Sequence, residues 1–156
     1  MFFISPSMGR LSFAEMMVDI HRYIRGLTSS SYKIIVGTDS MVRDNTCFIS
    51  AVVVHRLGKG ARYYYRQNNH RKIQSLRQKI FYETALSLEL GGQITKQFSE
   101  NGYSEMPVEI HIDVGTQGET RDLIKEVVGM VTGSGFQAKI KPDAYGASCV
   151  ADKHTK

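Results

Sequence analysis

The sequence predicts an α/β protein in which helices flank a mixed β-sheet. Apolar residues recur at helical spacing in three long segments, and five shorter segments are rich in β-branched and aromatic residues. Short turns separate the first three of these β-rich segments, whereas helices separate the later ones. Short turns predict antiparallel neighbours and helical crossovers predict parallel ones, so we expect both kinds of pairing in one sheet.

The first helix and the first three strands follow from local patterns. Apolar side chains recur about every 3.6 residues over 12–27, and Ser12 and Glu15 have the spacing of a capping box, which predicts a helix. Turn-forming residues at 44–45 and 57–60 then divide an antiparallel meander. Its three strands are expected at residues 32–38, 46–56 and 61–66.

The second half of the chain alternates helices and strands. A second helix is expected from about 70 to 90, where Gly91 and Gly92 provide a stop or a kink, with a further turn through Gln97 as the alternative. Thr116 and Glu119 have capping-box spacing ahead of a third helix, which ends at a glycine-rich turn. The remaining elements are a fourth strand at 108–114, a fifth at 136–141 and a short terminal helix from Ala147.

Length and composition limit the organisation of the chain. It has 156 residues, of which 42% are hydrophobic and 22% charged, so we expect a single domain over 1–156 with a helical extension at 1–31. No apolar run approaches the roughly 20 residues that cross a bilayer, and no secretory signal pattern is present. The two cysteines, Cys47 and Cys149, form no disulfide framework, so we expect a cytoplasmic protein.

Two aspartates fall where the predicted parallel strands end. Asp39 ends the first strand and Asp113 ends the fourth, and chemistry in such sheets collects beyond the carboxyl ends of the strands. If these strands are neighbours, their backbones lie about 4.8 Å apart, close enough for the two carboxylates to share a cation. Aspartate also favours turns, so each residue alone has an ordinary structural explanation.

Glu83 interrupts the apolar stripe of the second helix, which includes Ile80, Leu86 and Leu90. An ionised carboxylate facing the core must meet a cation, take up a proton, or reach solvent from the edge of the stripe. A divalent metal shared with Asp39 and Asp113 would explain all three acidic residues together.

A fourth acidic residue is expected near the end of the chain. Asp152, on the predicted terminal helix, is the preferred candidate because a helix lying across the strand ends would point it inward. Asp143 is the alternative, although Pro142-Asp143 is also typical of an ordinary turn.

Positive charge is concentrated in the middle of the sequence. Residues 45–82 contain eight Lys and Arg residues and no acidic residue, whereas the net charge of the whole chain is only +5. Clustered basic residues favour a nucleic-acid partner, and an exposed hairpin and helix face are the structural alternative. The residues we expect to contact nucleic acid are Arg62, Arg66, Arg71 and Lys72.

The order of these acidic residues resembles the ribonuclease H-like superfamily over about residues 32–156. Further short motifs are similar to the YkuK-type family of bacterial proteins, predicted to be ribonuclease H-related, namely Ser5-Pro6-Ser7, Gly37-Thr38-Asp39-Ser40, His111-Ile112-Asp113, Lys141-Pro142 and Val150-Ala151-Asp152-Lys153. The resemblance implies a five-stranded sheet in the order 3-2-1-4-5. It also implies hydrolysis of phosphodiester bonds in RNA, DNA or a hybrid with Mg²⁺ or Mn²⁺, with the catalytic and metal-binding residues Asp39, Glu83, Asp113 and Asp152.

One departure from the ribonuclease H pattern keeps an alternative open. Many ribonucleases H have a histidine in the loop before the last helix, whereas residues 142–148 contain none. The alternative to a two-metal nuclease is therefore a nucleic-acid-binding or protein-interaction module that uses the same fold without turnover. The chain lacks the P-loop, dinucleotide-binding, zinc-protease and serine-hydrolase motifs.

Overall fold

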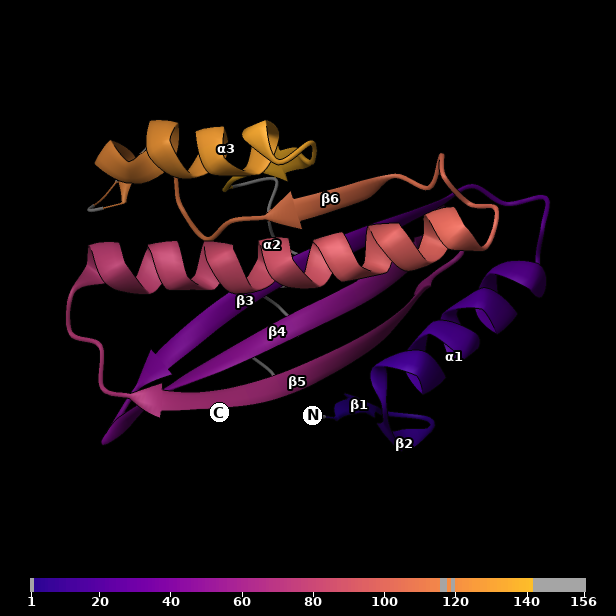
Figure 1. The fold of residues 1–156 in the computed structure, drawn as a ribbon, viewed down its shortest axis with the longest axis horizontal. Helices are drawn as coiled ribbons and strands as arrows, with labels where there is room; N and C mark the ends of the chain where they lie inside the picture. The colour runs from indigo at the N-terminus through magenta and orange to yellow at the C-terminus, as the bar shows by residue number, and fades with distance from the viewer. Residues whose placement is uncertain (1, 116–117, 119, 142–156) are drawn as a thin grey trace.

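The computed structural model describes residues 2–115, 118 and 120–141. A short hairpin and a helix precede a meander of three long strands, and helices then alternate with two short strands (Figure 1). In chain order the elements are β1 (Phe3–Ser5), β2 (Gly9–Leu11), α1 (Phe13–Arg25), β3 (Tyr32–Val42), β4 (Asn45–Arg56), β5 (Ala61–Arg71), α2 (Leu76–Glu100), β6 (Val108–His111), the 3-10 helix η1 (Arg121–Leu123), α3 (Ile124–Gly133) and β7 (Gln137–Lys139).

The strands form one mixed sheet in the order β2-β1-β5-β4-β3-β6-β7. β3, β6 and β7 are parallel neighbours, and the other pairings are antiparallel. The portion from β5 to β7 has the expected order 3-2-1-4-5, which confirms the predicted α/β class.

The expectation of five strands was wrong, because residues 1–31 contribute two strands as well as a helix. β1 and β2 form a hairpin that joins the free edge of β5 through the pair Ile4 and Tyr65. The Ser5 hydroxyl accepts a hydrogen bond from Met8 N at 3.1 Å, and Gly9 has a φ of 74°, so a serine and a glycine make the tight turn.

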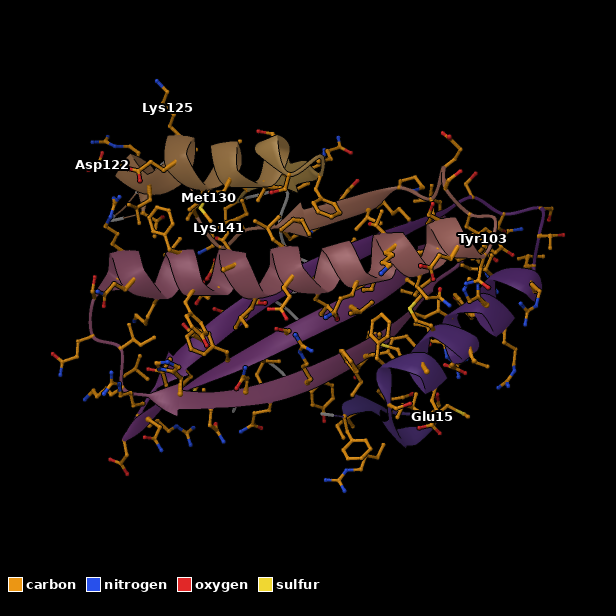
Figure 2. All side chains as sticks on the ribbon, in the orientation of Figure 1. Glu15, Tyr103, Asp122, Lys125, Met130 and Lys141 are labelled. Carbon is orange, nitrogen blue, oxygen red and sulfur yellow. The ribbon has the colours of Figure 1, made fainter. Side chains whose placement is uncertain are left out.

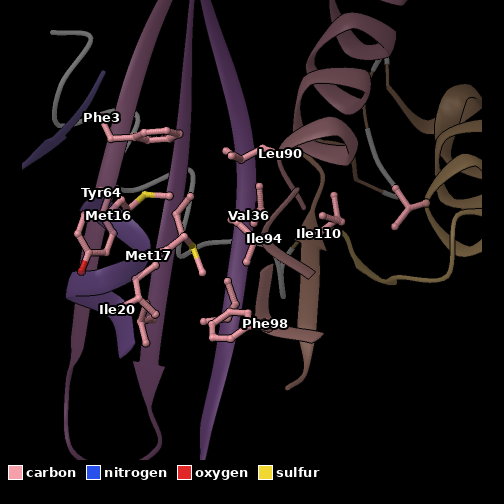
Figure 3. Close-up of a cluster of buried hydrophobic side chains, with 14 of the residues drawn as sticks. Phe3, Met16, Met17, Ile20, Val36, Tyr64, Leu90, Ile94, Phe98 and Ile110 are labelled. Atoms are coloured by element: carbon pink, nitrogen blue, oxygen red, sulfur yellow. The ribbon is translucent and has the colours of Figure 1, made fainter. Parts of the chain in front are cut away.

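Three helices pack on one face of the sheet and enclose the main hydrophobic core (Figures 1 and 3). Met16, Met17 and Ile20 of α1 lie against Tyr64 of β5, as the close-up shows. The predicted capping box of α1 is confirmed: Glu15 N donates to the Ser12 hydroxyl at 3.1 Å, and Ser12 N donates to the Glu15 carboxylate at 2.9 Å. A smaller cluster on the opposite face contains Ile35, Ala51 and Val53.

The boundary between the third long strand and the second helix was predicted wrongly. β5 continues to Arg71, because Arg71 pairs with Asn45 and keeps the strand in the sheet beyond residue 66. The helix begins only at Leu76, after Ser75, whose hydroxyl accepts a hydrogen bond from Gln78 N at 3.3 Å. Non-local strand pairing therefore overrides the helical spacing that starts near residue 70.

The expected stop at Gly91 and Gly92 was wrong and the alternative of a further turn through Gln97 was nearer, because α2 continues through both glycines to Glu100. A Cβ atom on Gly91 would lie 3.0 Å from Ile110 Cδ1 of β6 and 3.5 Å from the Phe136 ring. Gly91 therefore allows the helix to approach the sheet closely. Gly92 is exposed and would place a Cβ atom in open space.

Two expected features lie outside the described residues. These are the capping-box spacing of Thr116 and Glu119 and the terminal helix from Ala147. Among the described helices, none combines the length and the apolar character that a membrane crossing requires.

The two glycines of α2 give a paired test of this packing. Gly92→Ala should stabilise the protein by about 0.5–1 kcal/mol, because alanine is the better helix former at an open position. Gly91→Val should destabilise it by about 1–3 kcal/mol, because the added methyl groups meet Ile110 and Phe136. Urea unfolding of both variants measures the difference, and a Gly91→Val protein as stable as the wild type would contradict the proposed close approach.

Candidate functional site

Helix α2 brings Glu83 onto β3, where its carboxylate is buried. The side chain lies on the same helix face as Ile80 and Ser87, and the residue is 6% exposed. The Ser40 hydroxyl of β3 donates a hydrogen bond to Glu83 Oε2. The predicted interruption of the apolar stripe is therefore a buried carboxylate with a hydroxyl partner rather than a side chain that reaches solvent.

A second polar contact lies one helical turn further along α2. The Ser87 hydroxyl is 2.8 Å from Thr38 Oγ1, which is also 2.9 Å from the Ser50 hydroxyl of β4. Thr38 and Ser40 share one strand face, and Glu83 and Ser87 share one helix face, so the two pairs form a polar seam between α2 and β3. Sequence reasoning missed this seam, although the hydroxyls at alternate positions of Thr38-Asp39-Ser40 were its signal.

Asp39 is half-buried on β3, and strand alternation places it on the face opposite to Ser40. Its Oδ1 atom accepts a hydrogen bond from the Ser40 backbone N at 2.9 Å. The same face carries Ile35 and the smaller apolar cluster. Ser40, rather than Asp39, therefore contacts Glu83 directly.

Asp113 follows the end of β6 and lies level with Asp39. The last paired residues of β3 and β6 are Gly37 and His111, and both aspartates come two residues later. Ile112 is buried in the main core, so alternation directs Asp113 to the opposite face, as it does Asp39. The predicted neighbourhood of β3 and β6 is confirmed, and it brings the two aspartates to matching positions on adjacent chain segments.

Lys141 provides a positive charge beside this acidic group. Its Nζ atom is 2.7 Å from Asp113 Oδ1, a buried atom that accepts no well-directed hydrogen bond from the described residues. The contact with Asp113 raises the pKa of Lys141, and the charges of Asp39 and Glu83 raise it further. All three acidic residues therefore favour the charged form of Lys141.

Burial and charge together keep a proton on Glu83. Burial raises the pKa of this carboxyl to about 8, and the negative charges of Asp39 and Asp113 act in the same direction. The Ser40 hydrogen bond and the Lys79 charge lower the pKa of Glu83, but they do not cancel the increase caused by burial. At neutral pH and without a bound cation, Glu83 is consequently mainly the neutral acid.

The metal-binding arrangement stays a prediction. Across the described parts of the chain, no three His, Cys, Asp or Glu side chains are gathered closely enough to hold an ion. The preferred fourth acid Asp152 and its alternative Asp143 lie outside the described residues. The charges of Asp39 and Asp113 act on Glu83, and carboxylate oxygens are the hard ligands that Mg²⁺ and Mn²⁺ use.

His111 of the same sheet region has a structural environment. Its Nε2 atom is 3.2 Å from Glu109 Oε1, and Lys33 Nζ lies 3.5 Å from Glu109 Oε2. Burial lowers the pKa of His111, so the imidazole is neutral at neutral pH. Lys33 of β3 thus contacts Glu109 of β6, and Glu109 contacts His111, which lies two residues before Asp113.

The four basic residues expected to contact nucleic acid have different environments. Arg62 Nε is 2.9 Å from Asp19 Oδ2, and the Arg66 guanidinium lies 5.2 Å from the centre of the Phe3 ring. Burial lowers the pKa of Arg66. Arg71 is exposed at the end of β5, with Lys72 exposed immediately after it. Arg71 and Lys72 are therefore the more accessible pair.

Comparison with known proteins gives the class of this fold. A family model described as Ribonuclease H-like matches residues 15–156. The chain belongs to the ribonuclease H-like family. It is similar to the uncharacterized protein YkuK of Bacillus subtilis (strain 168), with 38% identity over 99% of this chain and 96% of that relative. No solved structure gives a significant match. The resemblance to the YkuK-type family is thus confirmed.

Replacing Glu83 with glutamine should make stability less dependent on pH. Below about pH 4.5 the carboxyl is protonated in both the folded and the unfolded chain, so wild type and Glu83→Gln should be similarly stable. Between the ordinary pKa of 4.5 and the folded-state pKa of about 8, the unfolded wild type releases the proton that the folded form retains. The wild type therefore loses stability relative to the variant as pH rises through this window.

Urea unfolding at pH 4.5, 7 and 8.5 in the presence of EDTA measures this effect. The variant should gain on the order of a few kcal/mol over the wild type at the highest pH, since one pKa unit corresponds to roughly 1.4 kcal/mol. Glu100→Gln, at the exposed end of the same helix, is the matched control. Parallel pH profiles for wild type and Glu83→Gln would contradict the protonated, buried carboxyl.

Proposed function

We propose that the protein is a divalent-metal-dependent nuclease that hydrolyses phosphodiester bonds of RNA, DNA or a hybrid in the cytoplasm. The observation that carries this proposal is the buried Glu83 carboxyl, whose pKa is raised by burial and by Asp39 and Asp113. The negative charges of Asp39 and Asp113 disfavour ionisation of Glu83, and a bound cation would offset this repulsion. The ribonuclease H-like family supports the same reaction class.

The proposed ion-binding residues are Asp39, Glu83, Asp113 and Asp152. Two divalent ions bound by such carboxylates would supply Lewis-acid chemistry and an activated water at neutral pH. Ser40 orients the Glu83 carboxyl through its hydrogen bond. Release of the proton on Glu83 accompanies ion binding in this proposal, because the ligand must be a carboxylate.

A specific contact favours the alternative of a module without turnover. The Lys141 ammonium lies 2.7 Å from Asp113 Oδ1 and supplies positive charge where a metal ion would. A protein that retains this ion pair during nucleic-acid binding would have a balanced acidic site and no catalytic ion. Metal-dependent cleavage distinguishes the nuclease from this binding module.

Asp39→Asn tests the acidic site directly. The substitution keeps the side-chain shape and removes one negative charge, so hydrolysis should fall by more than about 100-fold, because even outer-shell partners of metal ligands contribute roughly 10- to 100-fold. Labelled RNA, DNA and hybrid substrates with Mg²⁺ or Mn²⁺ provide the measurement. Asp122→Asn is the control, since that side chain is 89% exposed at the outer edge of η1 (Figure 2).

Each outcome of the cleavage assay has a clear meaning. Equal rates for wild type and Asp39→Asn would place any hydrolysis elsewhere and overturn the site. A wild type that neither cleaves these substrates nor gains thermal stability with Mn²⁺ would favour the binding module instead.

Nucleic-acid binding should weaken steeply with salt and should involve the accessible end of β5. Each phosphate contact on duplex DNA contributes about 0.9 to the log–log salt slope, so Arg71→Glu should reduce the slope by roughly one. Charge reversals at Arg62 and Arg66 should also flatten it, but they disturb contacts with Asp19 and Phe3. Lys125→Glu, on a side chain that points outward from α3 in Figure 2, is the control. Binding that does not respond to salt would contradict phosphate contacts.

A further inference from the structure

A basic pocket lies at the other end of the sheet from the acidic site. It has a volume of about 300 Å³ and is formed by the last turns of α1, the end of β4 and the start of β5. Its walls contain three arginines and one carboxylate, together with smaller contributions from the first hairpin. The lining side chains that matter here are Asp19, Arg22, Tyr23, Arg56 and Arg62.

Arg56 is held rigidly in this wall. Its Nε atom donates to the Tyr32 hydroxyl at 3.0 Å, and its Nη2 atom donates to the Tyr23 carbonyl at 2.8 Å. The guanidinium also stacks over the Tyr23 ring, 4.0 Å from the ring centre. Within the described residues these contacts leave Nη1 without a hydrogen-bond acceptor. A donor that is fixed in position but has no acceptor is suited to bind an anion.

Arg62, which also lines the pocket, is fixed in a similar way. Its Nε atom donates to Asp19 Oδ2 at 2.9 Å, and its Nη2 atom donates to the Ser7 hydroxyl at 3.0 Å. The same Asp19 oxygen accepts a hydrogen bond from the Tyr64 hydroxyl at 2.5 Å. Among the described residues, Nη1 of Arg62 likewise has no acceptor.

Arg22 completes the basic group and makes no comparable structural contact with the described residues. Its side chain is 64% exposed, and its nearest acidic oxygen, Asp19 Oδ1, is 3.8 Å away. The pocket is therefore lined by three guanidinium groups and one carboxylate, which already binds Arg62 and Tyr64. The pocket keeps an excess of about two positive charges. A ligand with two negative charges would neutralise this excess better than a ligand with a single carboxylate.

We propose that this pocket binds a phosphate monoester, either on a free nucleotide or at the end of a nucleic-acid strand. A phosphate monoester carries about −1.5 to −2 charges at neutral pH and offers three acceptor oxygens. Planar guanidinium groups bind such oxygens in pairs, and Arg22, Arg56 and Arg62 all line the pocket. The pocket volume is at the lower end of the range for small-molecule sites, which fits a group of nucleotide size.

The pocket is distinct from the acidic site. Arg56 pairs with Tyr32, the first residue of β3, and Asp39 lies seven residues further along that strand. At about 3.3 Å per residue the two positions are roughly 23 Å apart along the sheet. The proposal stands without any nuclease activity, so its test measures binding alone.

Charge reversal at Arg22 tests the pocket with a closely matched control. Arg22→Glu places a carboxylate at the pocket rim, whereas Arg25→Glu makes the same charge change in the same last turn of α1 but outside the pocket wall. Inorganic phosphate, adenosine 5′-monophosphate and a hexanucleotide with either a 5′-phosphate or a 5′-hydroxyl are titrated against each full-length protein. Calorimetry and the melting temperature are the two measurements.

We expect saturable binding of the phosphomonoester probes by the wild type and by Arg25→Glu, and a loss of affinity of at least about tenfold in Arg22→Glu. Tighter binding of the nucleotide than of the 5′-phosphorylated hexanucleotide would identify a free nucleotide as the source, and the reverse order would identify a strand end. Absence of saturable binding, or equal losses in both variants, would overturn the proposal. Equal binding of the hexanucleotide with a phosphate or a hydroxyl end, together with no saturable binding of adenosine 5′-monophosphate, would overturn it as well.

Discussion

The burial of Glu83 between α2 and β3 is the constraint on which the arrangement of this protein depends. An apolar residue at that position would pack α2 on the sheet at lower desolvation cost, so the carboxyl requires specific partners. Ser40 supplies one, and the Thr38–Ser87 contact one turn away continues the polar seam. Because hydroxyl and carboxyl groups must meet in pairs, the seam fixes how far along β3 the helix lies. Apolar packing alone would tolerate a shift more readily.

This fixed position has electrostatic consequences around Asp39 of β3 and Asp113, which follows β6. Parallel pairing brings Asp39 and Asp113 to the same level, and the seam keeps Glu83 within reach of their charges. Three carboxyl groups so close repel one another when all are ionised. The structure relieves the repulsion in two ways, through the proton on Glu83 and through the Lys141 ammonium on Asp113. If the proposed divalent cation binds here, it would replace both, and its binding would be coupled to proton release from Glu83 and to movement of Lys141.

Local sequence patterns predict the parts of this fold that depend on neighbouring residues. The capping box of α1 and the position of Glu83 within an apolar stripe are such patterns, and both match the structure. The errors arise where contacts with residues distant in the sequence determine the secondary structure. Arg71 remains in a strand because Asn45 lies opposite, and Gly91 continues a helix because Ile110 approaches it. The Ser40 contact was not identified either, since the order of the acidic residues suggested a metal shared with Asp39 and Asp113 as the partner of Glu83.

The basic segment at residues 45–82 shows that the sequence also limits what can be predicted about the placement of charge. Its eight Lys and Arg residues favoured a nucleic-acid partner for the whole segment, but Arg62 pairs with a carboxylate that α1 contributes from outside the segment. Strand alternation also directs Arg62 and Arg71 to opposite faces of the sheet. The positive charge is therefore divided between an exposed strand end and a pocket with fixed guanidinium groups. Exposed, mobile cations attract any polyanion, whereas guanidinium groups held by hydrogen bonds and a stacked ring favour one shape of anion. The two parts of a single basic segment thus have different binding chemistry, which only their three-dimensional contacts distinguish.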